Sequence, residues 1–326
     1  MPSLLSSPNR PSGGGCGDKY KQEGRKSMVN LYDNDTLSWR HGGRLYLIHI
    51  QRDELAESPR ENDNLAVMAC WHRRYSLGDK LEDKDAAAFW QRMVREYVPR
   101  TDVTNAARDG RLAGIRLAAN PADGRLIDIY ESVPWETGGI GPQECLEYEG
   151  VSAHNLYDYL ADDLTPIQCQ TLLHPYAVWL PVWLYDHGGL TVSCGERGYP
   201  YDDQWDSGCL GWIFVSKEAI LRGTDATTDT WRERGFEILR GEVEEYDQYL
   251  RGEVYGYTLY ESDIPEDGEA PDWAETGDSC WGFFGSDIEQ SGIADNIGYG
   301  LGDALREGTY QTGMATLHKS FYYTFA

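Results

Sequence analysis

The sequence lacks any apolar run of about 18 residues, so it contains no candidate membrane-spanning helix. Residues 1–28 lack the apolar centre of a signal peptide and predict a disordered leader. The seven cysteines are scattered, odd in number and form no C-x-x-C pair, which argues against a disulfide framework. We therefore expect a protein of a reducing cytosol.

The common cofactor motifs are also missing. No Gly-Lys pair occurs, which excludes a P-loop, and neither H-E-x-x-H nor an EF-hand loop is present. The glycines at 298, 300 and 302 do not have the spacing of a dinucleotide-binding turn. We therefore expect no cofactor, and no metal site is assigned from motifs.

Basic residues are scarce in the second half of the chain. Residues 1–150 carry 20 basic and 23 acidic side chains, whereas residues 151–326 carry 9 basic and 31 acidic ones. An acidic surface repels nucleic acid, so direct nucleic-acid binding is not expected, and a basic protein partner is favoured instead. Against 7 Phe there are 11 Trp and 22 Tyr, which suit interfaces as well as cores.

The hydrophobic pattern predicts both strands and helices. Alternation and turn residues predict strands over 44–50, 65–72, 126–130, 179–186, 189–194, 210–216, 254–261, 280–284 and 320–325. Spacing of three and four predicts helices over 83–97, 152–163, 217–221, 228–250 and 292–307. The rest of 100–150 looks irregular. Hairpins with interleaved helices predict an α+β fold with an antiparallel β-sheet core and flanking helices.

One candidate site combines two polar blocks, one made of Asp186, His187 and Asp206 and the other around His72, Arg73 and Arg74. Asp186 and His187 stand at a hairpin turn and Asp206 begins the next strand, while His72 follows an earlier strand. Histidine with carboxylates can run acid–base chemistry or hold a divalent metal. The arginines Arg60, Arg73 and Arg74 are candidates for binding an anion. The structural alternative is that aspartates and glycines only form the turns and arginines only pin loops.

A second candidate site is acidic. From Glu242 to Glu289 there are 15 acidic residues and one base, and the preceding helix directs further glutamates outward. Such a face can present charge at a density close to that of DNA. The alternative is a solvated surface that maintains solubility. The residues expected to bind a partner are Glu233, Glu237, Glu244, Asp247, Tyr246, Tyr249 and Trp273.

Several blocks resemble a family of phage, prophage and conjugative-element proteins. They are ESPRENDNLAVMACWHRRYSLGD (57–79), LPVWLYDHGG (180–189), WDSGCLGWIFVSKE (205–218), GEVEEYDQYLRGEVYGY (241–257) and DSCWGFF (278–284). The family has Trp where Asn62 stands and Ser where Gly189 stands. Residues 100–175 and those beyond 290 do not fit its pattern. The resemblance therefore implies a core domain over 29–290 with an insertion at 100–175, and a C-terminal extension over 291–326.

The family's setting implies a role in host takeover or in escape from host defence, in the bacterial cytosol. Our first expectation is a DNA-mimicking anti-CRISPR or anti-restriction protein that blocks a basic host defence complex without turnover. The alternative is a metal-dependent hydrolase or phosphoesterase that uses the two polar blocks, if these meet in one cleft. A structural or assembly factor is a third hypothesis. The oligomeric state stays open.

Overall fold

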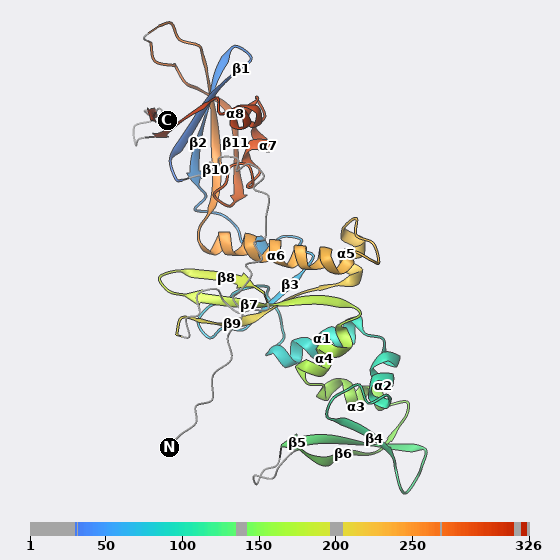
Figure 1. Cartoon of the computed structure of the whole chain (residues 1–326). Coiled ribbons are helices and arrows are strands. Elements are labelled where there is room, and N and C mark those ends of the chain that lie inside the picture. The colour runs from blue at the N-terminus through green and yellow to red at the C-terminus, as the bar shows by residue number, and fades with distance from the viewer. Residues whose placement is uncertain are drawn as a thin grey trace, which may run out of the picture.

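The computed structural model describes residue 30 and residues 32–134, 142–195, 205–267, 269–315 and 321–324. Over these ranges the chain forms three antiparallel β-sheets with covering helices, so the predicted α+β fold is confirmed. The sheets follow one another along an elongated molecule, and helix α6 (Trp231–Leu250) lies between two of them (Figure 1).

The first sheet has six strands in the order β11-β10-β2-β1-β12-β13. Helices α7 (Ile293–Ile297) and α8 (Leu301–Glu307) cover one face, and their apolar side chains share a core with Trp39 and Tyr257 (Figure 1). The strands are β1 (Asp35–His41), β2 (Arg44–Arg52), β10 (Val254–Asp263), β11 (Ala274–Phe284), β12 (Tyr310–Ala315) and β13 (Phe321–Thr324).

The second sheet has four strands in the order β3-β9-β7-β8 and carries the polar blocks. The predicted hairpin joins β7 to β8 through Gly188, which has a φ of 75° that favours glycine. Helix α5 starts directly after β9, with Ser216 as its N-cap. The elements are the 3₁₀ helix η1 (Pro59–Glu61), β3 (Val67–Cys70), β7 (Ala177–Asp186), β8 (Leu190–Cys194), β9 (Ser207–Ser216) and α5 (Lys217–Gly223).

Helix α6 covers one face of this second sheet. Its buried residues Trp231, Leu239 and Val243 recur at helical spacing and pack against the apolar side chains of β7 and β9. A β-carbon at Gly235 would lie 2.5 Å from a methyl group of Val178, so this glycine allows the helix to approach the sheet closely. The apolar stripe therefore fixes which side of α6 remains exposed.

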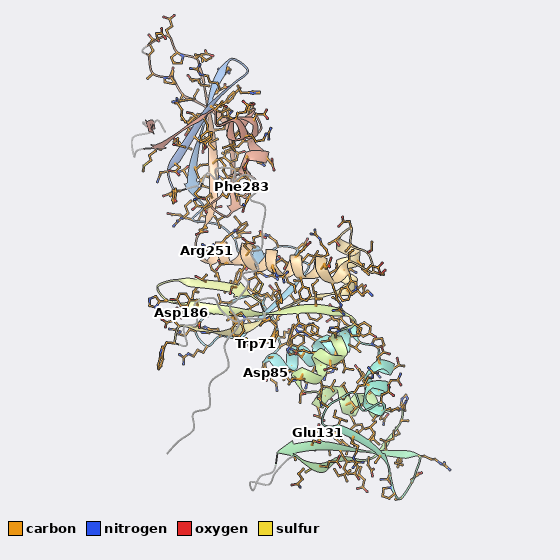
Figure 2. All side chains as sticks on the ribbon, viewed as in Figure 1. Trp71, Asp85, Glu131, Asp186, Arg251 and Phe283 are labelled. Atoms are coloured by element: carbon orange, nitrogen blue, oxygen red, sulfur yellow. The ribbon has the colours of Figure 1, made fainter. Side chains whose placement is uncertain are left out.

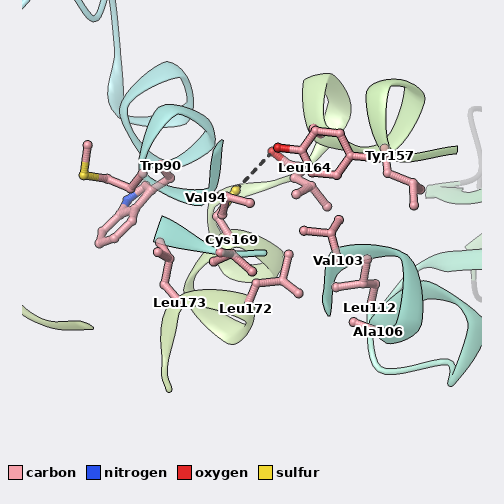
Figure 3. Close-up of a cluster of buried hydrophobic side chains, with 14 of the residues drawn as sticks. Trp90, Val94, Val103, Ala106, Leu112, Tyr157, Leu164, Cys169, Leu172 and Leu173 are labelled. Atoms are coloured by element: carbon pink, nitrogen blue, oxygen red, sulfur yellow. Dashed lines mark hydrogen bonds between the residues drawn. The ribbon is translucent and has the colours of Figure 1, made fainter. Parts of the chain in front are cut away.

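The third sheet and four helices form a lobe at the other end of the molecule (Figure 1). Figure 3 shows its core, to which Trp90, Val103 and Leu172 contribute from different helices. The ring of Trp90 also packs edge-on to Trp179 and Trp212, which joins this lobe to the second sheet. The elements are α1 (Ala86–Tyr97), α2 (Arg100–Arg108), β4 (Ile115–Ala119), β5 (Leu126–Pro134), β6 (Pro142–Ser152), α3 (Leu156–Asp163) and α4 (Pro166–Leu173).

Within 100–150, the strand predicted at 126–130 is confirmed as part of β5, whereas α2, β4 and β6 occupy stretches that were expected to be irregular. Helix α3 begins at Leu156, four residues later than predicted, and Ser152, the expected first residue of that helix, ends β6 instead. Residues 293–315 and 321–324 form the two helices that cover the first sheet and two of its strands. The expected leader lies outside the described residues. Within the described ranges, no helix is long and apolar enough to cross a membrane.

Candidate functional site: a cleft between two polar blocks

The ends of β7 and β9 bring two carboxylates together. Asp186 is the last residue of β7, and its backbone N–H donates to the carbonyl of Asp206, one residue before β9, at 2.8 Å. The two strands are antiparallel neighbours from Ala177 to Tyr185. The strand pairing therefore places Asp186 beside Asp206, although 20 positions separate them in the sequence.

His187 adds an imidazole to this pair. Its Nδ1 atom lies 2.6 Å from Oδ2 of Asp206, and its side chain remains 69% exposed. A carboxylate that accepts from Nδ1–H leaves Nε2 as a proton acceptor, the tautomer that a general base needs. The hairpin and the start of β9 thus form a histidine–carboxylate pair that is open to solvent.

The other polar block reaches the same place through β3. Strand β3 pairs with β9, and the N–H of Trp71 then donates to the carbonyl of Leu210 at 3.0 Å. At Gly211 a β-carbon would lie 1.9 Å from the carbonyl oxygen of Ala69, so no larger residue fits between the strands. The β7–β9 ladder has a register shift between Val182 and Trp183, close to this end of β9.

Arg74 connects the two blocks directly. Its guanidinium forms an ion pair with the carboxylate of Asp186, and the hydroxyl of Tyr75 lies 3.4 Å from the other oxygen of that carboxylate. The ring of His72 stacks on Tyr75, with centroids 5.1 Å apart. The condition that the sequence set for an enzyme, that the two blocks meet, is therefore satisfied.

Between the blocks lies a cavity of about 170 Å³, which we call the two-block cleft. Figure 2 labels one of its lining residues, Asp186, on the second sheet. His187 is not one of the lining residues, but it is bonded to Asp206, which is. The lining residues are His72, Arg73, Arg74, Leu184, Asp186, Trp205, Asp206, Ser207, Gly208, Cys209 and Leu210.

The charges of the cleft suit an anion on one side. Arg74 is partly neutralised by Asp186, whereas Arg73 is exposed and forms no ion pair within the described part of the chain. Burial raises the pKa of the Cys209 thiol, so this cysteine stays protonated near neutral pH and is a poor nucleophile. The groups suited to chemistry here are the histidines and arginines.

Two site residues, Tyr75 and Trp205, were not among the residues predicted from the sequence. Trp205 is a lining residue that is 94% exposed, and it stands next to Asp206 outside any apolar run. Its place beside a candidate site residue was the one signal in the sequence that could have identified Trp205 as part of the site. Tyr75 gave no such signal, since its contact with Asp186 depends on the fold.

Arg60 does not belong to the cleft and is not available to an external anion. Its side chain is only 2% exposed and donates to both oxygens of Asp79 at 2.8 and 3.1 Å. It also donates to Glu242 of α6 at 2.7 Å, and Glu242 accepts from two backbone N–H groups of residues 65 and 66. Burial works against the charged guanidinium, but the bonds to both carboxylates outweigh it and raise the pKa of Arg60. The structure therefore gives Arg60 the pinning role.

Tyr246 also proves to be structural, which corrects its assignment as a contact residue. It is 3% exposed, and its hydroxyl accepts from the N–H of Gly78 at 3.0 Å. Gly78 has a φ of 71°, and a β-carbon there would lie 2.5 Å from the carbonyl oxygen of Met68. Tyr246 thus holds a turn that only glycine fits, and it does not reach a partner.

The remaining acidic candidates lie in different surroundings. Glu233, Glu237 and Glu244 are exposed on α6, as expected, although Glu237 pairs with Arg234 at 2.9 Å. Asp247 is 15% exposed at its side chain, where it pairs with an arginine and accepts from a β8 backbone N–H. It therefore acts inside the fold. Tyr249 packs partly against the core of the second sheet, and Trp273 is half-buried.

A second, acidic hollow lies between α6 and the end of β11, near Arg251 in Figure 2. Its volume is about 660 Å³, and its carboxylates include Glu244, Glu245, Glu253 and Asp287. Burial raises the pKa of Glu245, as does the charge of Glu242 nearby. Other exposed carboxylates, among them Asp263, Glu266 and Asp272, lie at the end of β10 or between β10 and β11, so the acidic side chains are not confined to α6 and this hollow.

Over the described ranges, no three His, Cys, Asp or Glu side chains lie close enough together to hold a metal ion. The chemistry of the two-block cleft is therefore derived from its histidines, carboxylates and arginines.

Comparison with models of known protein families, with curated proteins and with solved structures finds no match for this chain. The resemblance to phage and conjugative-element proteins stays a prediction, and the function has to be argued from the site.

Proposed function

We propose that the chain is a phosphoesterase that acts on small phosphate esters in the two-block cleft. The observation that supports this most is the meeting of the two polar blocks, with the His187–Asp206 pair at one side and Arg73 and Arg74 at the other. Guanidinium groups bind phosphate through two parallel N–H donors. A histidine oriented by a carboxylate is a common general base.

Each residue has a distinct role in this proposal. Nε2 of His187 takes a proton from the attacking water, and Asp206 stabilises the imidazolium that results. Arg73 binds the phosphate. Arg74 contributes those N–H groups of its guanidinium that do not bond to Asp186. His72, half-buried in the cleft wall, donates a proton to the leaving group.

The test is a hydrolysis assay on p-nitrophenyl phosphate, bis-p-nitrophenyl phosphate and cyclic nucleotides. We expect turnover by the wild type that His187→Ala removes, while His154→Ala, an exposed histidine on a distant turn, keeps it. The assay is repeated with EDTA and with added Mg²⁺ or Mn²⁺, because the metal-dependent form of the hypothesis predicts a requirement. Absence of turnover on every ester, with and without metal, would refute the proposal.

A second candidate is the counter-defence inhibitor, which the exposed glutamates of α6 favour. Glu233, Glu237 and Glu244 project from one rigid helix beside the acidic hollow and could oppose a basic protein surface. Arginines 234 and 240 on the same helix reduce the net charge of this face, and Tyr246 and Asp247 do not contribute to it.

The inhibitor hypothesis is tested on DNA cleavage by purified CRISPR effectors and restriction nucleases. It predicts stoichiometric inhibition that weakens with salt and is lost when the three glutamates are replaced by lysine. Lysine at Glu57 and Glu82, in the loops next to η1 and α1, is the matched control. Inhibition that survives the triple replacement would remove this surface from consideration.

A further inference from the structure

We infer that the substrate of the two-block cleft carries a second phosphate group, which binds in a neighbouring hollow. This inference rests on the proposed function and adds the substrate class, a small bisphosphate. The hollow, which we call the loop hollow, has a volume of about 760 Å³ and is lined by residues 70–77, 79–81 and 83. His72, Arg73 and Arg74 line both the loop hollow and the cleft, so the two sites share one wall.

The loop that forms this shared wall is fixed at both ends. At its start, the N–H of Trp71 donates to the carbonyl of Leu210 in β9 at 3.0 Å. At its end, the N–H of Gly78 donates to the buried hydroxyl of Tyr246 at 3.0 Å. The backbone that carries the two arginines is therefore held between the cleft and the loop hollow.

The sizes of the two sites differ. A cavity of about 170 Å³ is smaller than the roughly 300 Å³ at which sites for drug-sized ligands begin, so the cleft takes one phosphate group and leaves the rest of an ester outside. The loop hollow, at about 760 Å³, has room for that remainder. Arg73 is exposed in the shared wall, so a ligand passes from one site to the other over its side chain.

The loop hollow is cationic, although the chain as a whole carries a formal net charge of −25. Its carboxylate Asp79 accepts from Arg60 at 2.8 Å. Its other carboxylate, Asp83, accepts from Arg92 at 2.7 Å. Neither of these two arginines lines the hollow, so both acidic charges are neutralised from behind. Because salt screens charges more than about 8 Å away, the cations that line the hollow decide what it binds.

One of these cations, Lys80, lines the loop hollow but not the cleft. Its Nζ atom lies 2.9 Å from Oε1 of Glu61, and the two side chains are 86% and 59% exposed. An exposed pair of this kind contributes little stability, so an anion in the hollow can displace Glu61 from the lysine. A phosphate monoester carries about two negative charges near neutral pH and therefore competes well for this ammonium group. We assign the second phosphate to Lys80 and the arginines of the shared wall.

The experiment is calorimetric titration of the full chain with fructose 1,6-bisphosphate, fructose 1-phosphate, fructose 6-phosphate and inorganic phosphate. We expect the bisphosphate to bind about ten-fold or more tightly than either monophosphate, because the second phosphate adds charge-assisted hydrogen bonds. Lys80→Ala should lower this preference by about three- to ten-fold. Glu61→Gln should increase it, because Lys80 then has no competing carboxylate. The matched control is Lys84→Ala, which removes a lysine that is 83% exposed and does not line the hollow, and it should keep the full preference.

The outcomes separate the inference from the function on which it rests. Equal affinity of the wild type for the bisphosphate and the monophosphates overturns the second phosphate site and leaves phosphate binding in the cleft intact. A preference that is unchanged in Lys80→Ala, or that falls equally in Lys84→Ala, also overturns it, since net charge alone would then set the affinity. If no phosphate compound binds, both the inference and the proposed function are refuted.

Discussion

The Nδ1 atom of His187 lies 2.6 Å from Oδ2 of Asp206, so a carboxylate that lines the two-block cleft orients the imidazole. We predict that His187→Ala lowers kcat for the best phosphate ester by about 10²- to 10⁴-fold, the usual contribution of a general base. Asp206→Asn should also lower kcat, because it no longer stabilises the imidazolium. The measurement is steady-state kinetics, with His154→Ala as the control. A loss confined to KM would contradict the role in proton transfer.

For Asp186, which pairs with Arg74, we predict that a replacement strengthens phosphate binding rather than impairing the site. The carboxylate of Asp186 lies in the cleft wall and repels an anion, although Arg74 partly neutralises it. We expect Asp186→Asn to tighten phosphate binding by about three- to ten-fold, as removal of one charge some 6 Å away should do. Arg73→Ala should weaken it. Both are measured by calorimetry with inorganic phosphate. If Asp186→Asn binds phosphate more weakly, Asp186 holds the ligand or a metal rather than opposing an anion.

Arg60 provides a test of the scaffold. Replacing it with alanine leaves two carboxylates, Asp79 and Glu242, facing each other with side-chain exposures of 20% and 13%. We expect the free energy of unfolding to fall by about 3–5 kcal/mol, as for other broken buried ion pairs. Urea denaturation measures it. The control is Lys80→Ala, which breaks an exposed pair with Glu61 and should cause no measurable change. Equal effects of the two replacements would contradict a structural role for Arg60.

Glu245 gives a pH-dependent prediction. Burial raises the pKa of this carboxyl, as does nearby Glu242, so the folded chain binds its proton more tightly than the unfolded chain. Such a group destabilises the fold above its raised pKa, and this penalty is relieved as the pH falls. We expect Glu245→Gln to increase the free energy of unfolding at pH 7–8. The gain should disappear below the ordinary carboxyl pKa of 4.5, where both states are protonated.

Urea denaturation between pH 4 and pH 8 measures this difference. Glu233→Gln, an exposed position on the same helix, is the control and should show little dependence on pH. A Glu245→Gln gain of the same size at pH 4 and pH 8, or a loss at pH 8, would refute the burial effect.

The sequence predicted the elements whose patterns are strong. The β7–β8 hairpin has an apolar run interrupted by two glycines, and α6 has buried residues at helical spacing. Strand β1 was missed although Thr36, Leu37, Ser38 and Trp39 alternate in polarity, because only two apolar residues mark this short pattern; all four side chains are buried. Helix α2 was missed because its buried residues are Val103 and two alanines, which give a weak apolar signal.

The composition of the candidate site could be read from the sequence, but its assembly could not. Asp186 and His187 are adjacent at a hairpin turn, whereas Asp206 reaches them through the pairing of β9 with β7. Arg74 lies 112 positions from Asp186, and their contact depends on β3 and β7 flanking β9. On α6 the residue type was misleading. Tyr246 is of a type common at interfaces, but its position on the apolar stripe of the helix buries it.

The most direct test of the phosphoesterase proposal is to locate a bound phosphate analogue. Crystals of the chain soaked in tungstate would give an anomalous signal at the anion site. We predict a peak in the two-block cleft, within hydrogen-bond reach of the Arg73 guanidinium and next to the His187–Asp206 pair. A peak elsewhere, or an empty cleft at millimolar tungstate, would contradict the proposal that this cleft binds phosphate.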